Sequence, residues 1–92
     1  MLKEVTKKQE EVEVLEVEDL NNKVILYNDD VNTFDFVIEC LVDICKHELL
    51  QAEQLTLIVH YKGKAVVKVG PLDEMQDVCT ALCDRGLSAE LQ

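Results

Sequence analysis

Positive charge is scarce in this chain of 92 residues: nine Lys and Arg stand against nineteen Asp and Glu, for a formal net charge of −10. Nucleic-acid-binding proteins neutralise phosphates with Lys and Arg, and anionic lipid surfaces attract the same residues. The composition therefore argues against general binding to DNA, RNA or anionic membranes. The apolar runs are also short, and none approaches the ~20 residues that a membrane-spanning helix needs.

Glycine and proline are rare as well, with three Gly and one Pro in the chain. The glycines are not clustered, which excludes the Gly-rich loops that bind phosphate groups. No Ser-His-acid or Cys-His pattern is readable, and the many carboxylates make any one pair weak support for acid–base catalysis. We therefore expect a protein that is not an enzyme and needs no cofactor.

The four cysteines are Cys40, Cys45, Cys79 and Cys83. Their spacings do not match zinc-binding motifs, and the N-terminal residues lack the apolar core of a secretory signal. Intracellular proteins usually keep their thiols reduced. We therefore expect a cytoplasmic protein whose cysteines are small apolar core residues on helices, with a metal-binding or redox role as the alternative hypothesis.

Residues 1–22 differ in composition from the rest of the chain. They contain three Lys and seven Asp or Glu, with no aromatic residue, Gly or Pro. Acidic and apolar residues alternate over 10–19, but glutamate disfavours strands and adjacent like charges repel. The pattern predicts a flexible acidic extension over 1–22, which a partner could grasp, followed by one folded domain over 23–92.

The first elements of that domain have clear signals. Residues 23–27 are β-branched and aromatic, which predicts a strand, and the polar turn Asn28-Asp29-Asp30 ends it. Helix N-cap chemistry at Asn32-Thr33 and apolar residues at helical spacing then predict a helix over about 33–46.

The rest of the domain alternates again between strand and helix signals. Residues 64–69 predict a strand, a helix follows from Asp73 and ends at Gly86, and alternating apolar residues over 87–91 predict a final strand. Local rules fit a helix and a strand equally well over 51–62, where a hairpin also stays possible. The order indicates an α+β domain with helices on one face of a small antiparallel sheet.

The turn Asn28-Asp29-Asp30 is the most unusual local feature. Asn and Asp serve commonly as turn and capping residues, which is one interpretation. The other is a recognition site for a cation, because carboxamide and carboxylate oxygens can both accept hydrogen bonds from an ammonium group. The turn alone does not decide between them.

Three segments in a fixed order resemble one known family. They are V-I-L-Y-N-D-D within 24–30, F-V at 36–37, and Q-L-T-L-I-V-H-Y-K-G-K-A at 54–65. Together they resemble the ClpS family, the adaptors of Clp ATP-dependent proteases. The resemblance covers about residues 23–92. It implies the order β-α-α-β-α-β, a three-stranded antiparallel sheet with three helices, and a helix over about 50–62.

The resemblance also implies a function. An adaptor of this family binds proteins that carry Leu, Phe, Tyr or Trp at a free N-terminus and delivers them to a Clp AAA+ unfoldase of the ClpA or ClpC type. The implied ligands of the α-amino group are Asn28, Asp29, Asp30 and His60. The implied hydrophobic pocket consists of Asn32, Phe34, Val37, Thr56, Val59 and Leu87. The N-terminal domain of the unfoldase would contact Asp73 and Glu74, and we expect the adaptor to be a monomer.

The chain departs from the family pattern within the pocket. The family commonly has Met at the positions of Phe34 and Thr56, so we expect a bulkier wall at the first and a wider side at the second. A competing hypothesis is a small α+β protein–protein interaction domain, similar in fold to the C-terminal domain of the ribosomal stalk protein, without such a pocket. The two hypotheses differ in whether Asn28 and His60 face each other.

Overall fold

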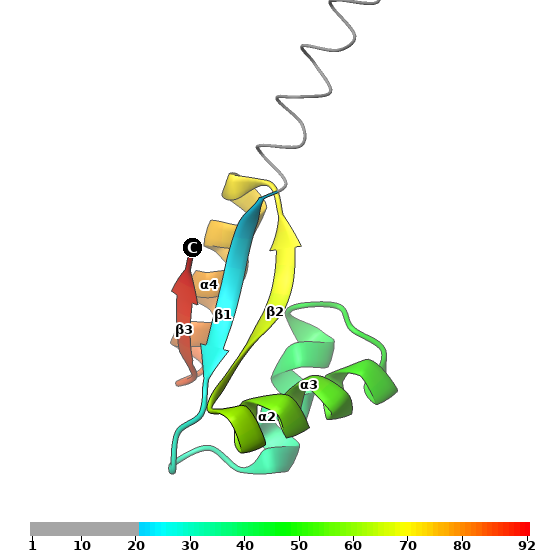
Figure 1. The fold of residues 1–92 in the computed structure, drawn as a ribbon. Helices are drawn as coiled ribbons and strands as arrows, with labels where there is room; N and C mark the ends of the chain where they lie inside the picture. The colour runs from blue at the N-terminus through cyan, green and yellow to red at the C-terminus, as the bar shows by residue number, and fades with distance from the viewer. Residues whose placement is uncertain (1–20) are drawn as a thin grey trace, which may run out of the picture.

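In the computed structural model, which describes residues 21–92, a three-stranded antiparallel sheet is covered by helices (Figure 1). The elements in chain order are β1 (Asn22–Tyr27), α2 (Phe34–Asp43), α3 (Leu49–Lys62), β2 (Lys64–Gly70), α4 (Leu72–Asp84) and β3 (Ser88–Leu91). The predicted order is confirmed, including the helix that local rules left undecided. The extension expected over 1–22 lies outside the described residues as far as residue 20.

The strand β1 is the centre of the sheet, whose order is β2-β1-β3. β1 pairs antiparallel with β2 from Asn22↔Gly70 to Tyr27↔Lys64, with a register shift after Val24. It pairs antiparallel with β3 along its second half. Alternate side chains of a strand point to opposite faces. Val24 and Leu26 share one face of β1 and are 0% and 1% exposed, so this face of the central strand belongs to the core.

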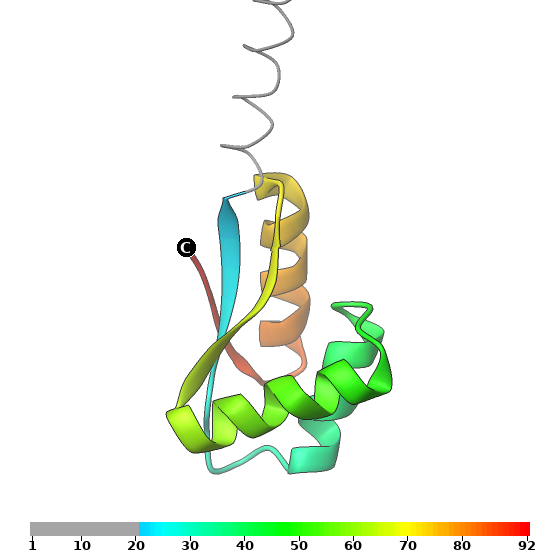
Figure 2. The ribbon, with the colours of Figure 1, turned by 45° about the vertical axis from the view of Figure 1, so that its right-hand side comes forward.

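The helices occupy two positions around this sheet. α4 runs along one face and contacts all three strands, whereas α2 and α3 pack on each other at the end of the sheet where β1 finishes (Figure 2). This arrangement places the loop after β1 beside α3. Within residues 21–92, no helix is both long enough and apolar enough to cross a membrane.

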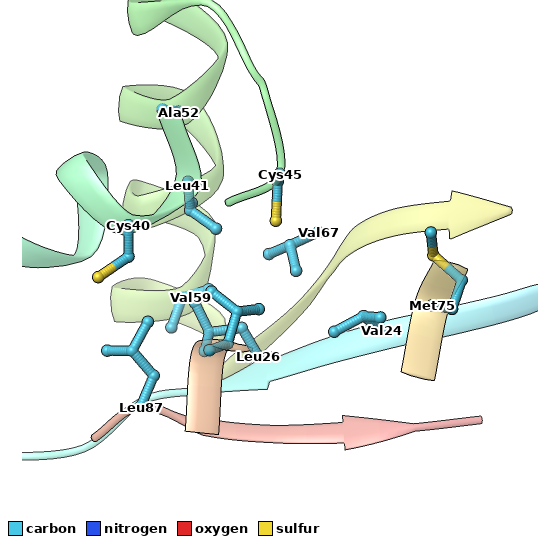
Figure 3. Close-up of a cluster of buried hydrophobic side chains, with 11 residues drawn as sticks. Val24, Leu26, Cys40, Leu41, Cys45, Ala52, Val59, Val67, Met75 and Leu87 are labelled. Carbon is cyan, nitrogen blue, oxygen red and sulfur yellow. The ribbon is translucent and has the colours of Figure 1, made fainter. Parts of the chain in front are cut away.

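The core is one cluster of buried side chains that joins the sheet to all three helices (Figure 3). Its members are Val24, Leu26, Cys40, Leu41, Cys45, Ala52, Val59, Val67, Met75, Leu82 and Leu87. Because this cluster includes residues of α2, α3 and α4 as well as of the sheet, it fixes the positions of the helices relative to the strands.

The four cysteines are all free, and they differ in burial. Cys40 on α2 and Cys45 in the turn after α2 are core residues, whereas Cys79 is half-buried and Cys83 is exposed on α4. The expectation of core residues on helices therefore fits Cys40 but not Cys45, which lies in a turn, or Cys83, which is exposed. Burial raises the pKa of Cys45 to about 11, so this thiol is protonated at neutral pH. The part of the chain that is described contains no group of three or more His, Cys, Asp or Glu arranged to hold a metal ion.

Candidate functional site

The loop between β1 and α2 is closed by the carboxylate of Asp29. Its Oδ1 accepts hydrogen bonds from the backbone N–H groups of Val31 and Asn32, at 2.9 and 2.8 Å. Its Oδ2 accepts a third bond from the side-chain amide of Asn32, at 2.9 Å. Asp commonly closes a turn in this way because its short side chain reaches the backbone two and three residues ahead. The loop therefore has a defined shape in the absence of any ligand.

Two longer-range hydrogen bonds fix this loop to the rest of the domain. The amide of Asn32 donates a bond of 2.9 Å to the carbonyl of Gly86, 54 positions later in the sequence. At the other end, the backbone N–H of Asn28 donates a bond of 2.9 Å to the carbonyl of Gly63. The loop is thus held against both the α4–β3 turn and the end of α3.

Gly63 ends α3 in the conformation that lets the chain turn back into β2. Its φ of 88° is left-handed, which glycine adopts without steric cost, and its N–H donates to the carbonyl of Val59 at 2.9 Å. Since Gly63 also accepts the bond from Asn28, the last turn of α3 lies beside the Asn28 end of the loop. His60 belongs to that last turn.

A pocket of about 270 Å³ lies between the loop, α2 and α3. The loop and α3 contribute polar groups from Asn28, Asp29, Asp30, Asn32 and His60. The two helices contribute the side chains of Phe34, Val37, Thr56 and Val59. Nine of the ten residues assigned to the amine site and the hydrophobic pocket therefore line one concavity.

Leu87, the tenth residue, is a core residue that follows α4 and is 5% exposed. It lines a small hollow of about 20 Å³ that adjoins the pocket. The two cavities share five lining residues, Asn28, Asp29, Asn32, Val37 and Val59. The same hollow includes Leu26 and Tyr27, which sequence reasoning did not assign to the site.

The two carboxylates of the loop have different surroundings. The backbone and side-chain N–H groups of Asn32, followed by the backbone N–H of Val31, hold the pKa of Asp29 below its ordinary value. Asp30 is exposed, and its carboxylate has no hydrogen bond or ion pair with any residue of 21–92. Asp29 is thus engaged in the loop, whereas Asp30 is free to accept a bond from outside.

The α3 side of the pocket combines one exposed and one buried polar residue. His60 is exposed, and its ring meets that of Tyr61 edge-on with centroids 5.4 Å apart. Thr56 is 3% exposed, and its hydroxyl donates to the carbonyl of Ala52 at 2.7 Å. Because its proton is used within the helix, Thr56 forms part of the wall and is not a free donor. The His60 imidazole has no hydrogen-bond partner in the described part of the chain and can accept a bond when neutral.

Asp73 and Glu74 do not line this pocket. They are exposed in the first turn of α4, at the end of the sheet opposite to α2 and α3 (Figure 1). Acidic residues in a first helical turn complement the helix dipole. The pair therefore belongs to an exposed part of the surface that is separate from the pocket.

Comparison with known proteins shows which family the chain is similar to. Residues 17–90 match the family described as "ATP-dependent Clp protease adaptor protein ClpS". The adapter protein ClpS of Thermosynechococcus vestitus is 41% identical over 69 residues, which is 74% of this chain and 73% of that protein. The ClpS of a Nostoc species is 52% identical over 52 residues, which is 55% of this chain and 54% of that protein.

A solved structure is similar in fold as well. It is that of Agrobacterium tumefaciens ClpS2 bound to L-phenylalaninamide, with a TM-score of 0.74 and 25% sequence identity over 77% of this chain and 93% of that one. The family match extends from residue 17 almost to the end of β3 and so includes the loop, both pocket helices and the sheet. The chain belongs to the ClpS family, the adaptors of ATP-dependent Clp proteases.

Proposed function

We propose that this chain binds proteins through a free N-terminal residue with a bulky hydrophobic side chain, and delivers them to a Clp AAA+ unfoldase. The observation that carries the proposal is the pocket of about 270 Å³, which is lined by both hydrogen-bond acceptors and apolar side chains. Such a site matches a ligand with an ammonium group next to a large apolar side chain, which is the chemistry of a protein N-terminus.

The ammonium group is held by the loop and by His60. A free α-amino group has a pKa near 8, so at neutral pH it is mostly charged and offers three donors. Asn28, Asp30 and the neutral His60 ring supply acceptors at the rim, and Asp30 supplies the compensating charge. Asp29 contributes by keeping the loop closed.

The side chain of the first residue enters between α2 and α3. Val37 and Val59 form apolar walls, and Phe34, which is 41% exposed, stands at the opening. Thr56 is smaller than the Met common in the family, so the α3 side has room for a large side chain. The bound L-phenylalaninamide in the related ClpS2 has the same two parts, an aromatic side chain and a free α-amine.

The expected affinity is moderate. Hydrogen bonds to a charged group contribute roughly 1.5–3 kcal/mol each, and burial of a Leu or Phe side chain adds roughly 1.5–3 kcal/mol. After the cost of ordering the peptide, these values suggest a dissociation constant of about micromolar order. Reversible capture of this strength suits an adaptor that must release its cargo.

Delivery requires a second contact with the unfoldase, of the ClpA or ClpC type. We assign it to the surface around Asp73 and Glu74, which is exposed and lies away from the pocket, so the adaptor could hold substrate and unfoldase together. An interaction domain without a pocket, the competing hypothesis, gives no role to a concavity that joins the loop to His60.

The decisive experiment compares peptides that differ only at the N-terminal group. Fluorescence anisotropy with a labelled Leu-initiated or Phe-initiated peptide should show binding, and acetylation of the α-amine should weaken it by about 100-fold or more, because both the charge and two donors are lost. A matched peptide that begins with Ser should also bind weakly, since it leaves the apolar walls uncovered. Equal affinity for the free and the acetylated peptide contradicts the proposal.

A further inference from the structure

The helix α3 has apolar residues on two opposite sides. The apolar Ala52 and Val59, with the polar Thr56 between them, are buried against the domain at spacings of four and three residues. On the other side Leu50, Leu57 and Tyr61 are 66%, 42% and 80% exposed. A helix with two apolar faces normally has both of them covered, yet in this structure only one is covered.

The exposed side forms a continuous stripe, which we call the outer stripe: Leu50, Gln54, Leu57, Ile58 and Tyr61. In Figure 2, α3 lies across the lower end of the molecule with the sheet and α4 to one side of it. With ordinary side-chain areas, the apolar part of the stripe amounts to about 400 Å², within the ~300–600 Å² typical of the largest patch on a monomer. Patches of this size often mark interaction sites.

Charge distinguishes the outer stripe from the exposed sides of the other helices. α2 exposes Asp35, Glu39 and Asp43, and α4 exposes Asp73, Glu74, Asp77 and Asp84. The outer stripe contains no charged residue, and Gln54 is its only strongly polar one. Two copies of a chain with net charge −10 repel each other least where no acidic residue faces the partner.

Four of the five residues of the outer stripe, all except Ile58, have a spacing that is the same when read in either direction. Leu50, Gln54, Leu57 and Tyr61 follow at intervals of four, three and four residues. An antiparallel pair of α3 helices related by a twofold axis therefore places Leu50 opposite Tyr61 of the second copy, and Leu57 opposite Gln54 of the second copy. Such self-complementarity is what a twofold interface requires.

We propose that the outer stripe is a self-association surface, through which two copies of the chain form a weak antiparallel dimer. The dimer is weak because a stable interface usually buries about 800 Å² per partner, roughly twice the area of this patch. The pocket stays open in it, since the pocket-lining residues of α3 are Thr56, Val59 and His60, none of which belongs to the outer stripe. The expectation of a monomer then applies only at low concentration.

Sedimentation equilibrium of the full chain, from a few micromolar to about 1 mM, tests the proposal. The weight-average mass should rise from 10.5 kDa towards twice that value as concentration increases. Leu57→Glu should hold the mass at the monomer value over the whole range, because the twofold axis brings two new carboxylates into the interface. A wild-type chain that stays monomeric at the highest concentration overturns the proposal.

The matched control is Val69→Glu, which adds the same charge at a 52% exposed apolar position on β2, outside the outer stripe. It should leave self-association unchanged. If both variants reduce association equally, net charge and not the stripe is responsible, and the proposal fails. Circular dichroism confirms that each variant is folded, and the milder Leu57→Gln, expected to weaken association about tenfold, replaces Leu57→Glu if the latter unfolds.

Discussion

The two ends of this domain present acidic residues in different ways. At the α2–α3 end, Asp29 and Asp30 belong to a loop that internal hydrogen bonds hold over a pocket of about 270 Å³. At the opposite end, Asp73 and Glu74 stand exposed in the first turn of α4 and line no part of that pocket. Similar residue types thus line a pocket at one end and stand exposed outside it at the other.

The two ends match the two tasks that we propose for them, although their compositions are alike. A small group such as an ammonium ion needs acceptors fixed around a cavity, because ordering mobile side chains on binding reduces affinity. A protein partner can be met by exposed charge, which mainly speeds and orients association. We therefore expect single substitutions in the pocket to change peptide affinity strongly. Substitutions at the α4 end should change the binding of the unfoldase only weakly.

The largest effect is expected from His60→Ala. Loss of one hydrogen bond to a charged ligand costs roughly 1.5–3 kcal/mol, so affinity for a Leu-initiated peptide should fall about 10- to 100-fold in fluorescence anisotropy. His47→Ala is the control, because His47 bonds to the carbonyl of Val67 and does not line the pocket. Equal losses of peptide affinity in the two variants would contradict the assignment of His60 to the binding site.

The variants Asp30→Asn and Asp29→Asn each remove one negative charge, so they form a matched pair. We expect the first to affect peptide binding and the second to affect the stability of the loop. Asp30→Asn is expected to weaken peptide binding about tenfold with an unchanged melting temperature. Asp29→Asn should weaken the loop's own hydrogen bonds and destabilise the fold by about 1 kcal/mol, or about 4–8 °C in melting temperature. Differential scanning calorimetry and anisotropy measure both effects, and the assignment is wrong if the melting temperatures fall in the reverse order.

A double variant at the other end, Asp73→Asn with Glu74→Gln, should affect delivery and not capture. Peptide affinity is expected to stay within about twofold, while binding to the N-terminal domain of the unfoldase weakens several-fold, mainly through slower association at low salt. Surface plasmon resonance measures both. The charge-matched control is Asp84→Asn with Glu53→Gln, and a similar loss in that variant would show a general effect of net charge.

The smallest effect concerns pH. Hydrogen bonds from Asn32 and Val31 lower the pKa of Asp29 below its ordinary value of 3.8, so its carboxylate stabilises the folded loop at neutral pH. Since the folded-state pKa is the lower one, that contribution is complete above about pH 4–5 and is lost as pH falls through the lowered pKa. An NMR titration of the Asp29 carboxyl carbon should give a midpoint below 3.8, and a midpoint above that value contradicts the loop geometry.

Much of the fold could be predicted from the sequence, because local signals mark most element ends. The strand before Asn28, the N-cap at Thr33 and the glycines Gly63 and Gly86 correspond to observed boundaries within a few residues. The motifs also selected all nine residues that line the pocket. Leu87 was assigned by its position near the C-terminus; it is buried in the core and lines the small hollow that adjoins the pocket.

The sequence by itself determined the strands and helices outside residues 49–62, the acidic composition and the residue types of the loop, since these depend on composition or on neighbours a few positions apart. Tertiary structure decided that residues 49–62 form a helix, because Ala52, Thr56 and Val59 make one buried side only when there is a core to pack against. It also decided that Asp29 accepts hydrogen bonds within the loop while Asp30 stays exposed, and that Asn32 reaches Gly86. Contacts between distant parts of the chain have no local signal, so only the folded domain shows them.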